Sequence, residues 1–445
     1  KMKGLLSQLE NALGVLSTNS NTEFNGISID SRNIKKGNLF VAIKGKNFDG
    51  HDYIDNAFNN GASALITERK FKDVPQIIVK NTETSLGQIA SHYLNLIGPL
   101  SIGITGTNGK TSVTSLIGSM LNEYQPTITS HGNYNNQIGL PLSIFKLKNH
   151  HKFCILEMGA SKVGDISYLV NIALPKIVTL LNVSPAHLDS FKTIDNILTC
   201  KEEIFLNQSY KKIVILNKDD KYFSRWEKIC EQHILKTISQ SQIADYYISN
   251  KKDNIITIST SKNETFDLDV KDQQKYILNN ILTSIACSME AGASSQHIID
   301  GYNNRIDVDG RFSVKKGING STIIDSSYNA NPASFESSID SLISMNGRPW
   351  VILGDMGELG DKSEQYHCQI AKYAKEKGIE KIFITGKYQS SIANVFGKGA
   401  FSFETIPELI AFVLPIIKED VNILIKASRF MRFETIVDAL TKIKY

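Results

Sequence analysis

The chain has 445 residues, 41% hydrophobic and 21% charged, and its 49 basic and 45 acidic side chains give a net charge of +4. Such a composition is typical of a globular protein with two or three domains. The charges are interspersed, so we expect neither a nucleic-acid-binding stripe nor a polybasic membrane patch.

The five cysteines are odd in number and scattered, with no C-x-x-C pair. This usage argues against a disulfide framework or a zinc site and favours a reducing compartment. No apolar run approaches the roughly 20 residues needed to span a bilayer, and no apolar signal core lies near the first residue. We therefore expect a cytoplasmic protein without membrane insertion.

Residues 1–80 form the first expected unit, an α/β domain. Strands are predicted at 26–31, 39–43, 64–67 and 76–79, and a helix at 52–60. Two polar clusters interrupt this pattern: Asp30-Ser31-Arg32 and the loop that begins at Lys44. Arginine offers a forked donor suited to phosphate, but such clusters are also typical of plain turns with a surface ion pair.

The second expected unit, residues 81–308, opens with a helix at 81–98 and then a phosphate loop. A buried strand, 101–105, runs into Gly106, Gly109, Lys110 and Thr111, and an amphipathic helix follows. The glycines let backbone N–H groups curl around phosphate oxygens, Lys110 supplies a cation, and Thr111 a hydroxyl for Mg²⁺. The general pattern G-x-x-x-x-G-K-[ST] would need glycine where Ile104 stands, so the glycine spacing differs although the strand, the glycine turn, Lys-Thr and the helix are all present. The alternative interpretation is a strand-to-helix turn that binds no ligand.

Strands and helices then alternate, with further strands at 153–158, 176–183 and 212–216. This alternation predicts a mostly parallel sheet of the P-loop ATPase kind, whose ligands bind beyond the carboxyl ends of the strands. Glu157 and His187 follow such ends, so we expect them to be ligands or positioning residues. The Asn-rich loop 131–141, with Asn133, Asn135 and Asn136, is either a turn or a substrate contact.

Residues 245–275 resemble a β-ribbon, and an apolar helix is predicted at 277–291. The third expected unit, residues 309–445, alternates again and predicts a Rossmann-like, doubly wound domain. Its strands are expected at 321–325, 349–353, 381–385 and 421–426. Polar loops follow the first two of these strands, where a site is expected.

These motifs together resemble the Mur ligase family, ATP-dependent enzymes that form amides in peptidoglycan synthesis. The resemblance covers the whole chain. It is carried by sequence runs at 30–32, 37–45, 105–111, 132–141, 186–189, 325–332 and 353–360, the most specific being Tyr-Asn-Ala-Asn-Pro and Gly-Asp-Met-Gly-Glu-Leu-Gly.

The resemblance implies roles for individual residues. Lys110, Glu157, His187 and Lys201 would be catalytic, and Thr111, Glu157, His187 and Lys201 would hold two Mg²⁺ ions. Lys201 matches the lysine that family members carbamylate, which would turn an ammonium into oxygen ligands that magnesium prefers. ATP would be bound by Thr105, Gly106, Thr107, Asn108, Gly109, Lys110, Thr111, Ser112, Asn280, Arg311, Asp325, Tyr328 and Asn329, and the other substrate by Ser31, Arg32, Lys44, Asn133, Asn135 and Asn136.

The chain also departs from the family pattern. Tyr276 and Ile277 stand where a His-Asn pair usually leads into the adenine-reading helix, and only Asn280 matches. The adenine contacts are thus left open.

The implied reaction adds D-alanyl-D-alanine to UDP-N-acetylmuramoyl-tripeptide through an acyl phosphate, with ATP and Mg²⁺, in the cytoplasm of a bacterium and by a monomer. The third peptide residue, lysine or diaminopimelate, is left open. Two alternatives remain: another amide ligase on the same scaffold, such as a folylpolyglutamate synthetase-like enzyme, and a nucleotide switch. Residues 1–80 count against the first, and the lack of a convincing guanine-reading motif at Asn217-Lys-Asp-Asp220 counts against the second.

Overall fold

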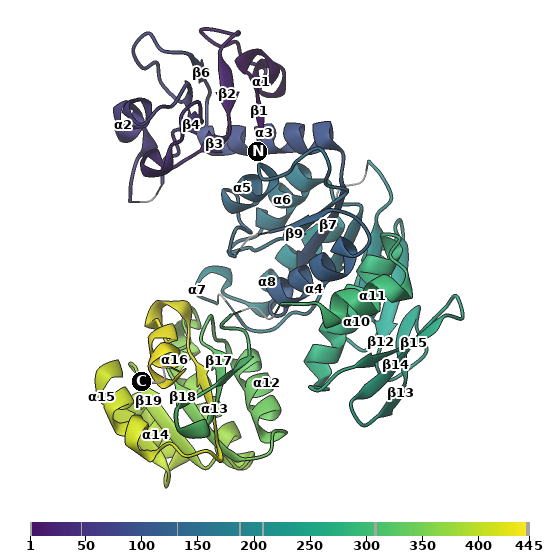
Figure 1. Cartoon of the computed structure of the whole chain (residues 1–445), viewed down its shortest axis with the longest axis vertical. Coiled ribbons are helices and arrows are strands. Elements are labelled where there is room, and N and C mark those ends of the chain that lie inside the picture. Colours follow the sequence, from purple (N-terminus) through teal and green to yellow (C-terminus); the bar gives the residue numbers. More distant parts are fainter. Residues whose placement is uncertain are drawn as a thin grey trace.

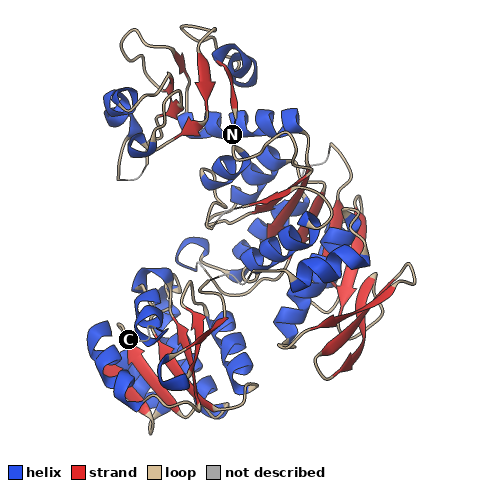
Figure 2. Cartoon of the chain, in the orientation of Figure 1, coloured by secondary structure: helices blue, strands red, loops and turns tan. Residues whose placement is uncertain are grey.

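The computed structural model describes residues 2–45, 47–130, 132–186, 188–206, 209–306 and 309–441. Its strands form sheets of four, nine and six strands and a small pair, arranged in three bodies along the chain (Figure 1). The three bodies follow one another in an arc, with the nine-stranded sheet in the middle. Helices lie on both faces of the two larger sheets (Figure 2).

The N-terminal body contains a parallel sheet in the order β3-β4-β5-β6. Its strands are Ile27–Ser28, Leu39–Val41, Ala64–Thr67 and Gln76–Ile78, and α2 spans Ile54–Asn59. A second layer joins β1 (Lys3–Leu5) to β2 (Glu23–Asn25) beside α1 (Leu6–Leu13). The strand expected at 26–31 has only two residues, because a 3₁₀ turn, η1 (Ser31–Asn33), begins where Asp30 accepts a hydrogen bond from the Arg32 N–H.

A single long helix, α3 (Thr82–Ile97), leads from this body to the next. Asn81 caps its first turn by accepting a hydrogen bond from the Thr84 N–H, and Gly98, at φ +69°, ends it. One face of α3 packs against α5 (Gly139–Ile144) and α6 (Asp165–Ala173) of the middle body (Figure 1). Since β7 follows directly, α3 links the N-terminal sheet to the phosphate loop.

The middle sheet has the order β15-β14-β13-β12-β11-β10-β7-β9-β8. Neighbours from β8 to β13 are parallel, whereas β13, β14 and β15 form an antiparallel ribbon, as the sequence predicts. In chain order the strands are Leu100–Thr105 (β7), Thr127–Thr129, Phe153–Glu157, Ile177–Leu180, Ile213–Asn217, Ile234–Ser239, Tyr246–Lys252, Ile255–Thr260 and Thr265–Asp269.

Two hydrophobic layers cover the two faces of this sheet. One lies under α4 (Lys110–Asn122), α10 (Lys275–Glu290) and α11 (Ser295–Asn303). The other joins α5, α6 and α8 (Ile194–Glu202) to α3 and the N-terminal sheet. Short helices α7 (Leu188–Phe191) and α9 (Phe223–Ile229) complete the body. The sheet is thus buried on both faces, which leaves the carboxyl ends of its strands to form a site.

The C-terminal body has a sheet in the order β16-β17-β21-β18-β19-β20, parallel except for β16. Its strands β16 to β21 are Ser313–Lys316, Thr322–Ser326, Arg348–Leu353, Lys381–Thr385, Ala400–Phe403 and Val421–Lys426. Its helices α12 to α16 are Pro332–Ile343, Ser363–Glu376, Gln389–Phe396, Ile406–Val413 and Glu434–Thr441. Apolar clusters fill both faces of the sheet, so the expected α/β class holds throughout.

All five cysteines lie in the described ranges and are unpaired. Four are buried, and Cys368 on α13 is partly exposed. Burial raises the pKa of the Cys154, Cys200 and Cys230 thiols to about 12. Within the described part of the chain, no helix combines the length and apolar character needed to cross a membrane.

Candidate active site

The phosphate loop lies between β7 and α4, at the carboxyl end of the middle sheet. Gly109 has φ +87°, and a Cβ there would lie 2.6 Å from Asn280 Oδ1 on α10, so glycine is required at this position. Among the described side chains none caps the first turn of α4. The free N–H groups and the helix dipole therefore favour an anion at this end.

Two lysine side chains converge on one carbonyl of this loop. Lys110 Nζ donates to Gly106 O at 2.9 Å and to Thr107 O at 3.0 Å, and Lys201 Nζ donates to Gly106 O at 3.0 Å. Burial, and next the Lys110 ammonium, lowers the pKa of Lys201 to about 7. Burial also lowers the pKa of Lys110, although Glu157 opposes this. Lys201 is therefore buried beside the loop, and Lys110 is half-buried there.

A carboxylate and a hydroxyl meet opposite the lysines. Thr111 Oγ1 donates to Glu157 Oε2 at 2.5 Å, and Asn135 Nδ2 donates to Glu157 Oε1 at 2.7 Å. The Glu157 N–H donates to Ser130 Oγ at 3.0 Å, and the residue is only 2% exposed. Its two carboxyl oxygens are thus oriented from two sides, and carboxyl oxygens are the ligands that a hard divalent cation prefers.

A cavity of about 1050 Å³ opens between this loop and the C-terminal body. It is lined by fifteen of the residues named from the sequence: Gly106, Thr107, Asn108, Gly109, Lys110, Ser112, Asn133, Asn135, Asn136, Glu157, Lys201, Asn280, Arg311, Tyr328 and Asn329. Two hydrogen bonds join the side chains of Asn108 and Asn331 between the bodies: Asn331 Nδ2, at the start of α12, donates to Asn108 Oδ1 at 2.7 Å, and Asn108 Nδ2 donates to Asn331 Oδ1 at 3.4 Å. The two bodies thus meet at the phosphate loop.

The C-terminal wall of the cavity is cationic. The Arg311 guanidinium stacks over the Tyr328 ring, with its carbon 4.3 Å from the ring centre. Arg311 Nε and Tyr328 Oη are buried and have no hydrogen-bond partner among the described residues. Buried polar atoms left this way carry a desolvation cost that a polar ligand would offset, so this wall fits an anionic, hydrogen-bonding ligand.

Other residues named from the sequence lie away from the cavity wall. Thr105 Oγ1 donates to Met158 O at 2.8 Å inside the sheet. Asp325 is 3% exposed and accepts from Lys315 Nζ at 2.9 Å. Burial opposes its ionisation, but hydrogen bonds from Ser327 and Lys315 outweigh this and hold the pKa of Asp325 below its usual value.

The N-terminal residues are remote from this cavity as well. Ser31 is buried, whereas the Arg32 side chain is 83% exposed and paired with Asp30 at 2.9 Å, and Lys44 is exposed. They belong to the first body, so they would serve a different part of a long substrate. His187 lies outside the described residues.

Sequence reasoning left several cavity residues unassigned. Asn182 ends the segment after β10 and exchanges hydrogen bonds with the Asn108 backbone at 2.9 and 3.0 Å. Lys426, at the end of β21, is buried and donates to Ser326 Oγ at 2.9 Å and to Asn329 O at 3.0 Å. Burial, followed by Arg311, lowers the pKa of Lys426 to about 7. The strand-end rule that found Glu157 would have found Lys426 too.

Three family models match the chain in succession: the Mur ligase family catalytic domain at residues 23–94, the Mur ligase middle domain at 104–288, and the Mur ligase glutamate ligase domain at 310–429. The UDP-N-acetylmuramoyl-tripeptide–D-alanyl-D-alanine ligase of Buchnera aphidicola from Acyrthosiphon pisum is 34% identical, over 94% of this chain and 93% of its own. The chain belongs to the Mur ligase family.

Other Mur ligases agree with this membership. The enzyme of the same name from Escherichia coli K12 is 30% identical over 98% of both chains. The crystal structure of MurF from Acinetobacter baumannii superposes with a TM-score of 0.92 at 26% identity, over 99% of both chains. The MurF ligase from Thermotoga maritima, solved in complex with ADP, gives a TM-score of 0.83 at 27% identity, over 93% of this chain and 96% of that one. The three-body architecture is therefore that of a Mur ligase.

Proposed function

We propose that this Mur ligase joins D-alanyl-D-alanine to UDP-N-acetylmuramoyl-tripeptide and converts ATP to ADP and phosphate. The observation that carries the proposal is the cavity that Lys110 and Glu157 line together with residues of the C-terminal body, where the Asn108 and Asn331 amides meet. Thr111 stands behind Glu157 and donates to its carboxylate. Relatives that match nearly the whole chain bear the name of this reaction. A phosphate-binding site and an acceptor-binding body on opposite walls are what a two-substrate ligase needs.

We assign the nucleotide sugar to residues 1–80, ATP to residues 81–308, and D-alanyl-D-alanine together with part of the ATP site to residues 309–445. The ADP-bound relative supports nucleotide binding at the phosphate loop. The unpartnered Arg311 Nε and Tyr328 Oη support an ATP contact from the third unit. Asp325 lies behind this wall, and it would affect ATP binding indirectly, through Lys315 and Ser327, which both donate hydrogen bonds to its carboxylate.

The first step activates a carboxylate, which is unreactive toward amines. An oxygen of the tripeptide's terminal carboxylate attacks the γ-phosphorus of ATP, the bond to the β,γ-bridging oxygen breaks, and ADP leaves with that oxygen. Lys110, the loop N–H groups and the N-terminus of α4 stabilise the charge spread over the transferring phosphoryl group. The product is an acyl phosphate.

The side chains present fit the magnesium that such chemistry uses. Thr111 and Glu157 offer oxygen donors beside the loop, and ATP phosphates would supply further oxygen ligands, since no group of three or more His, Cys, Asp or Glu side chains gathers among the described residues. Bound there, Mg²⁺ would neutralise phosphate charge. Lys201, buried beside Lys110, is the residue we expect to be carbamylated, because a carbamate in that position would add anionic oxygens.

The second step forms the amide. The neutral amine of D-alanyl-D-alanine attacks the acyl carbon, the nitrogen loses a proton, and phosphate leaves from the tetrahedral intermediate. No side chain needs to become covalently bound. Closure of the C-terminal body over the cavity would exclude water, which would otherwise hydrolyse the acyl phosphate.

The test is a substrate-dependence assay with the purified chain. ADP release should require ATP, UDP-N-acetylmuramoyl-tripeptide and D-alanyl-D-alanine together, and mass spectrometry should find the pentapeptide product. Turnover with a single amino acid would indicate a different amide ligase, and turnover without either acceptor would indicate a nucleotide switch. Separate assays with lysine-containing and diaminopimelate-containing tripeptides would identify the third residue.

We further propose that the enzyme works as a monomer in the bacterial cytoplasm. Five unpaired cysteines, four of them buried, fit a reducing compartment. Light scattering coupled to size-exclusion chromatography measures the oligomeric state, and a mass of two chains would contradict the monomer.

A further inference from the structure

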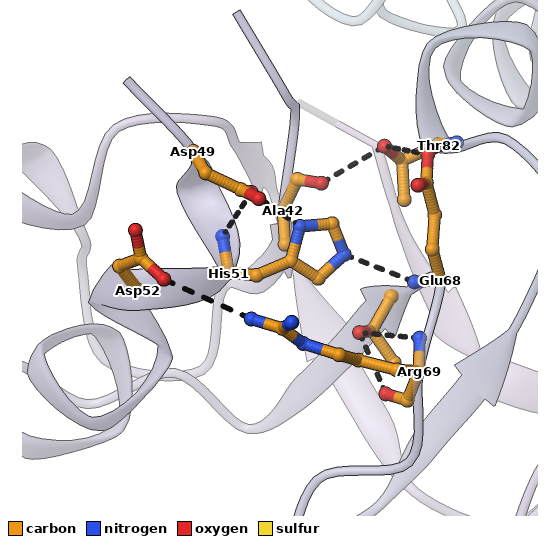
Figure 3. Close-up of polar contacts among 8 residues, drawn as sticks. Ala42, Asp49, His51, Asp52, Glu68, Arg69 and Thr82 are labelled. Atoms are coloured by element: carbon orange, nitrogen blue, oxygen red, sulfur yellow. Dashed lines mark hydrogen bonds and ion pairs between the residues drawn. The ribbon is translucent and has the colours of Figure 1, made fainter.

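His51 is a buried histidine in the N-terminal body that the reaction above does not use. It lies in the 3₁₀ turn η2 (Gly50–Tyr53), and its side chain is 3% exposed. Nδ1 is 2.6 Å from Asp49 Oδ1, and Nε2 is 3.0 Å from the backbone nitrogen of Glu68, just after β5 (Figure 3). The ring thus joins two segments that are not adjacent in the sequence.

The partners of the ring determine which nitrogen carries the proton. The Glu68 N–H can only donate, so Nε2 must accept from it. In the neutral ring the proton then lies on Nδ1, which donates to Asp49. The same Asp49 oxygen also accepts the backbone N–H of His51 at 3.0 Å. Both ring nitrogens are satisfied, so the side chain has one orientation.

The network continues from Glu68 to the helix that leads to the ATP-binding body. Glu68 Oε1 accepts from the Thr82 N–H at 3.0 Å, in the first turn of α3, and Thr82 Oγ1 donates to Ala42 O at 2.8 Å (Figure 3). A carboxylate at this end of a helix is stabilised by free N–H groups and by the helix dipole. His51 is therefore connected, through the Glu68 backbone and side chain, to the first turn of α3.

On its other side His51 holds a hairpin whose described arms, residues 43–45 and 47–50, pair through the Lys44–Asp49 bridge and through the Gly45 N–H, which donates to Phe48 O at 2.8 Å. Gly50 N donates to Ile43 O at 2.8 Å, and a Cβ on Gly50 would lie 2.7 Å from the Ile43 nitrogen, so the base of the hairpin is tight. Its tip exposes Lys44 and an aromatic ring, Phe48, which is 72% exposed.

The turn that carries His51 also borders the Arg32 cluster. Tyr53, in the same 3₁₀ turn, is close enough to Arg32 to affect the pKa of its guanidinium, which the Asp30 carboxylate raises above its usual value. Asn60, just after α2, donates to Ser31 O at 2.9 Å. The N-terminal body thus exposes two cations, Arg32 and Lys44, and two aromatic rings, Phe48 and Tyr53, which are the kinds of side chain that bind the phosphates and the base of a uridine diphosphate.

We propose that His51 is a positioning residue for the nucleotide-sugar substrate: by bridging Asp49 and the Glu68 backbone, it fixes the hairpin arms 43–45 and 47–50 against the start of α3 in the orientation that binds the uridine diphosphate. The inference rests on the proposed function, because it assumes that this body binds a UDP-linked substrate. His51 itself touches no substrate. It acts through Lys44 and Phe48.

The test measures binding by titration calorimetry with UDP-N-acetylmuramoyl-tripeptide, with UDP alone, and with ADP. His51→Ala removes both bridges and should raise the Kd of the first two ligands by about 10-fold or more, while the Kd of ADP and kcat at saturating substrate stay within about 2-fold of wild type. His51→Gln, whose amide oxygen can accept from the Glu68 N–H, should recover part of the loss. Asp52→Asn is the matched control in the same turn: its carboxylate makes only an exposed pair with Arg69 at 3.7 Å, so no ligand should be affected.

The contrary outcomes are distinct. If the wild-type chain binds UDP-N-acetylmuramoyl-tripeptide and His51→Ala binds it as tightly, the positioning role is wrong and the proposed function stands. If the Kd of ADP rises as much as that of UDP, His51 supports the whole fold and the positioning role is again wrong. If the wild-type chain binds neither uridine ligand, both proposals fail. If His51→Ala does not fold, the same binding measurements are made with His51→Asn and His51→Gln. Wild-type affinity of both variants for UDP-N-acetylmuramoyl-tripeptide would overturn the inference.

Discussion

At the scale of single residues, the lysines of the middle body show how burial tunes charge. Lys110 and Lys201 donate to the same carbonyl, Gly106 O, so two amines lie close together, Lys201 buried and Lys110 half-buried. Burial first, and then repulsion by the Lys110 ammonium, favours a neutral Lys201, and a neutral amine is the form that reacts with CO₂. The position therefore favours the modification proposed for it.

Replacing Lys201 by alanine should lower kcat by about 100-fold or more, because anionic oxygens proposed to act beside the phosphates would be lost. Folding should persist, since a buried amine is removed and only one carbonyl bond goes with it. Carbon-13 NMR of wild-type protein in labelled bicarbonate should show a carbamate signal that the variant lacks. Full activity of Lys201→Ala in bicarbonate-free buffer would contradict the carbamate.

The buried side chain of Lys212 should make the stability of the protein depend on pH. It is fully buried, donates to the carbonyls of Ile204 and Leu206, and burial lowers its pKa to about 8. The pKa of Lys212 is about 8 in the folded chain and 10.5 in the unfolded chain, so between these pH values the unfolded chain binds more protons at Lys212. The contribution of Lys212 to the free energy of unfolding should therefore rise with pH in this range. Below pH 8 both states carry the charge and the contribution is level.

Urea unfolding at pH 7.5 and at pH 9.5 checks this sign. The difference in unfolding free energy between wild type and Lys212→Met should shift in favour of wild type at the higher pH. The comparison cancels the titration of other groups. A difference that is constant, or that shifts toward the variant, would show that Lys212 is not a buried cation.

At the scale of elements, the position of the phosphate loop depends on how closely α11 approaches α4. A Cβ on Gly301 would lie 2.4 Å from the Met120 Cα, and Ser119 Oγ donates to Gly301 O at 2.7 Å. The obstacle is backbone rather than a flexible side chain, so the helices would have to separate. Because α4 begins at the loop, any such shift would reach the phosphate site.

Gly301→Ala should lower the free energy of unfolding by about 1–3 kcal/mol or more through overpacking, and should weaken ADP binding several-fold. Ser119→Ala removes the adjoining hydrogen bond without adding volume, and should cost about 0.5–1.5 kcal/mol with little effect on ADP. Chemical denaturation and calorimetry measure the two quantities. Equal effects of the two substitutions would argue against a steric origin.

How far the sequence predicts these elements depends on their burial. Strands 64–67, 381–385 and 421–426 were predicted at the residues observed, because each is a continuous apolar run covered on both faces. β16 and α11 were not foreseen: β16 is an edge strand with two lysines, and α11 buries only Ile298, Gly301 and Tyr302. Such elements form because a neighbour is already in place, and a local pattern does not contain that information.

At the scale of the whole molecule, the site is shared between two bodies, and this is the part that sequence reasoning reached least. Motifs identified Asn108 and the loop containing Asn331, but not that their amides meet. Hydrophobic periodicity also does not predict two further contacts between the middle and C-terminal bodies. Tyr276 Oη lies 3.1 Å from Ser341 Oγ of α12, and the Leu188 nitrogen donates to Glu358 O at 2.8 Å. Contacts between bodies depend on their relative orientation, which no single segment encodes.

The Asn108–Asn331 contact can be tested apart from folding, because Asn331 also caps α12 by accepting from the Ser334 N–H at 2.9 Å. Serine and aspartate are good caps as well, so Asn331→Ser and Asn331→Asp should keep the melting temperature within a few degrees. Both lose the side-chain amide N–H that donates to Asn108 Oδ1 and should raise the KM for ATP by about 5- to 10-fold. The aspartate should be the worse of the two, since its charge faces the phosphates. An unchanged KM in both would show that the contact does not serve ATP.

The arrangement of the thiols has a practical consequence for following motion between the bodies. Four cysteines are sealed in the interior, and burial keeps their thiols protonated, while Cys368 sits part-exposed on α13 of the C-terminal body. A maleimide dye offered to the folded, unaltered chain should therefore attach to a single position on the body expected to close. One cysteine introduced on the outer face of the middle body would complete a distance reporter, with no native cysteine removed.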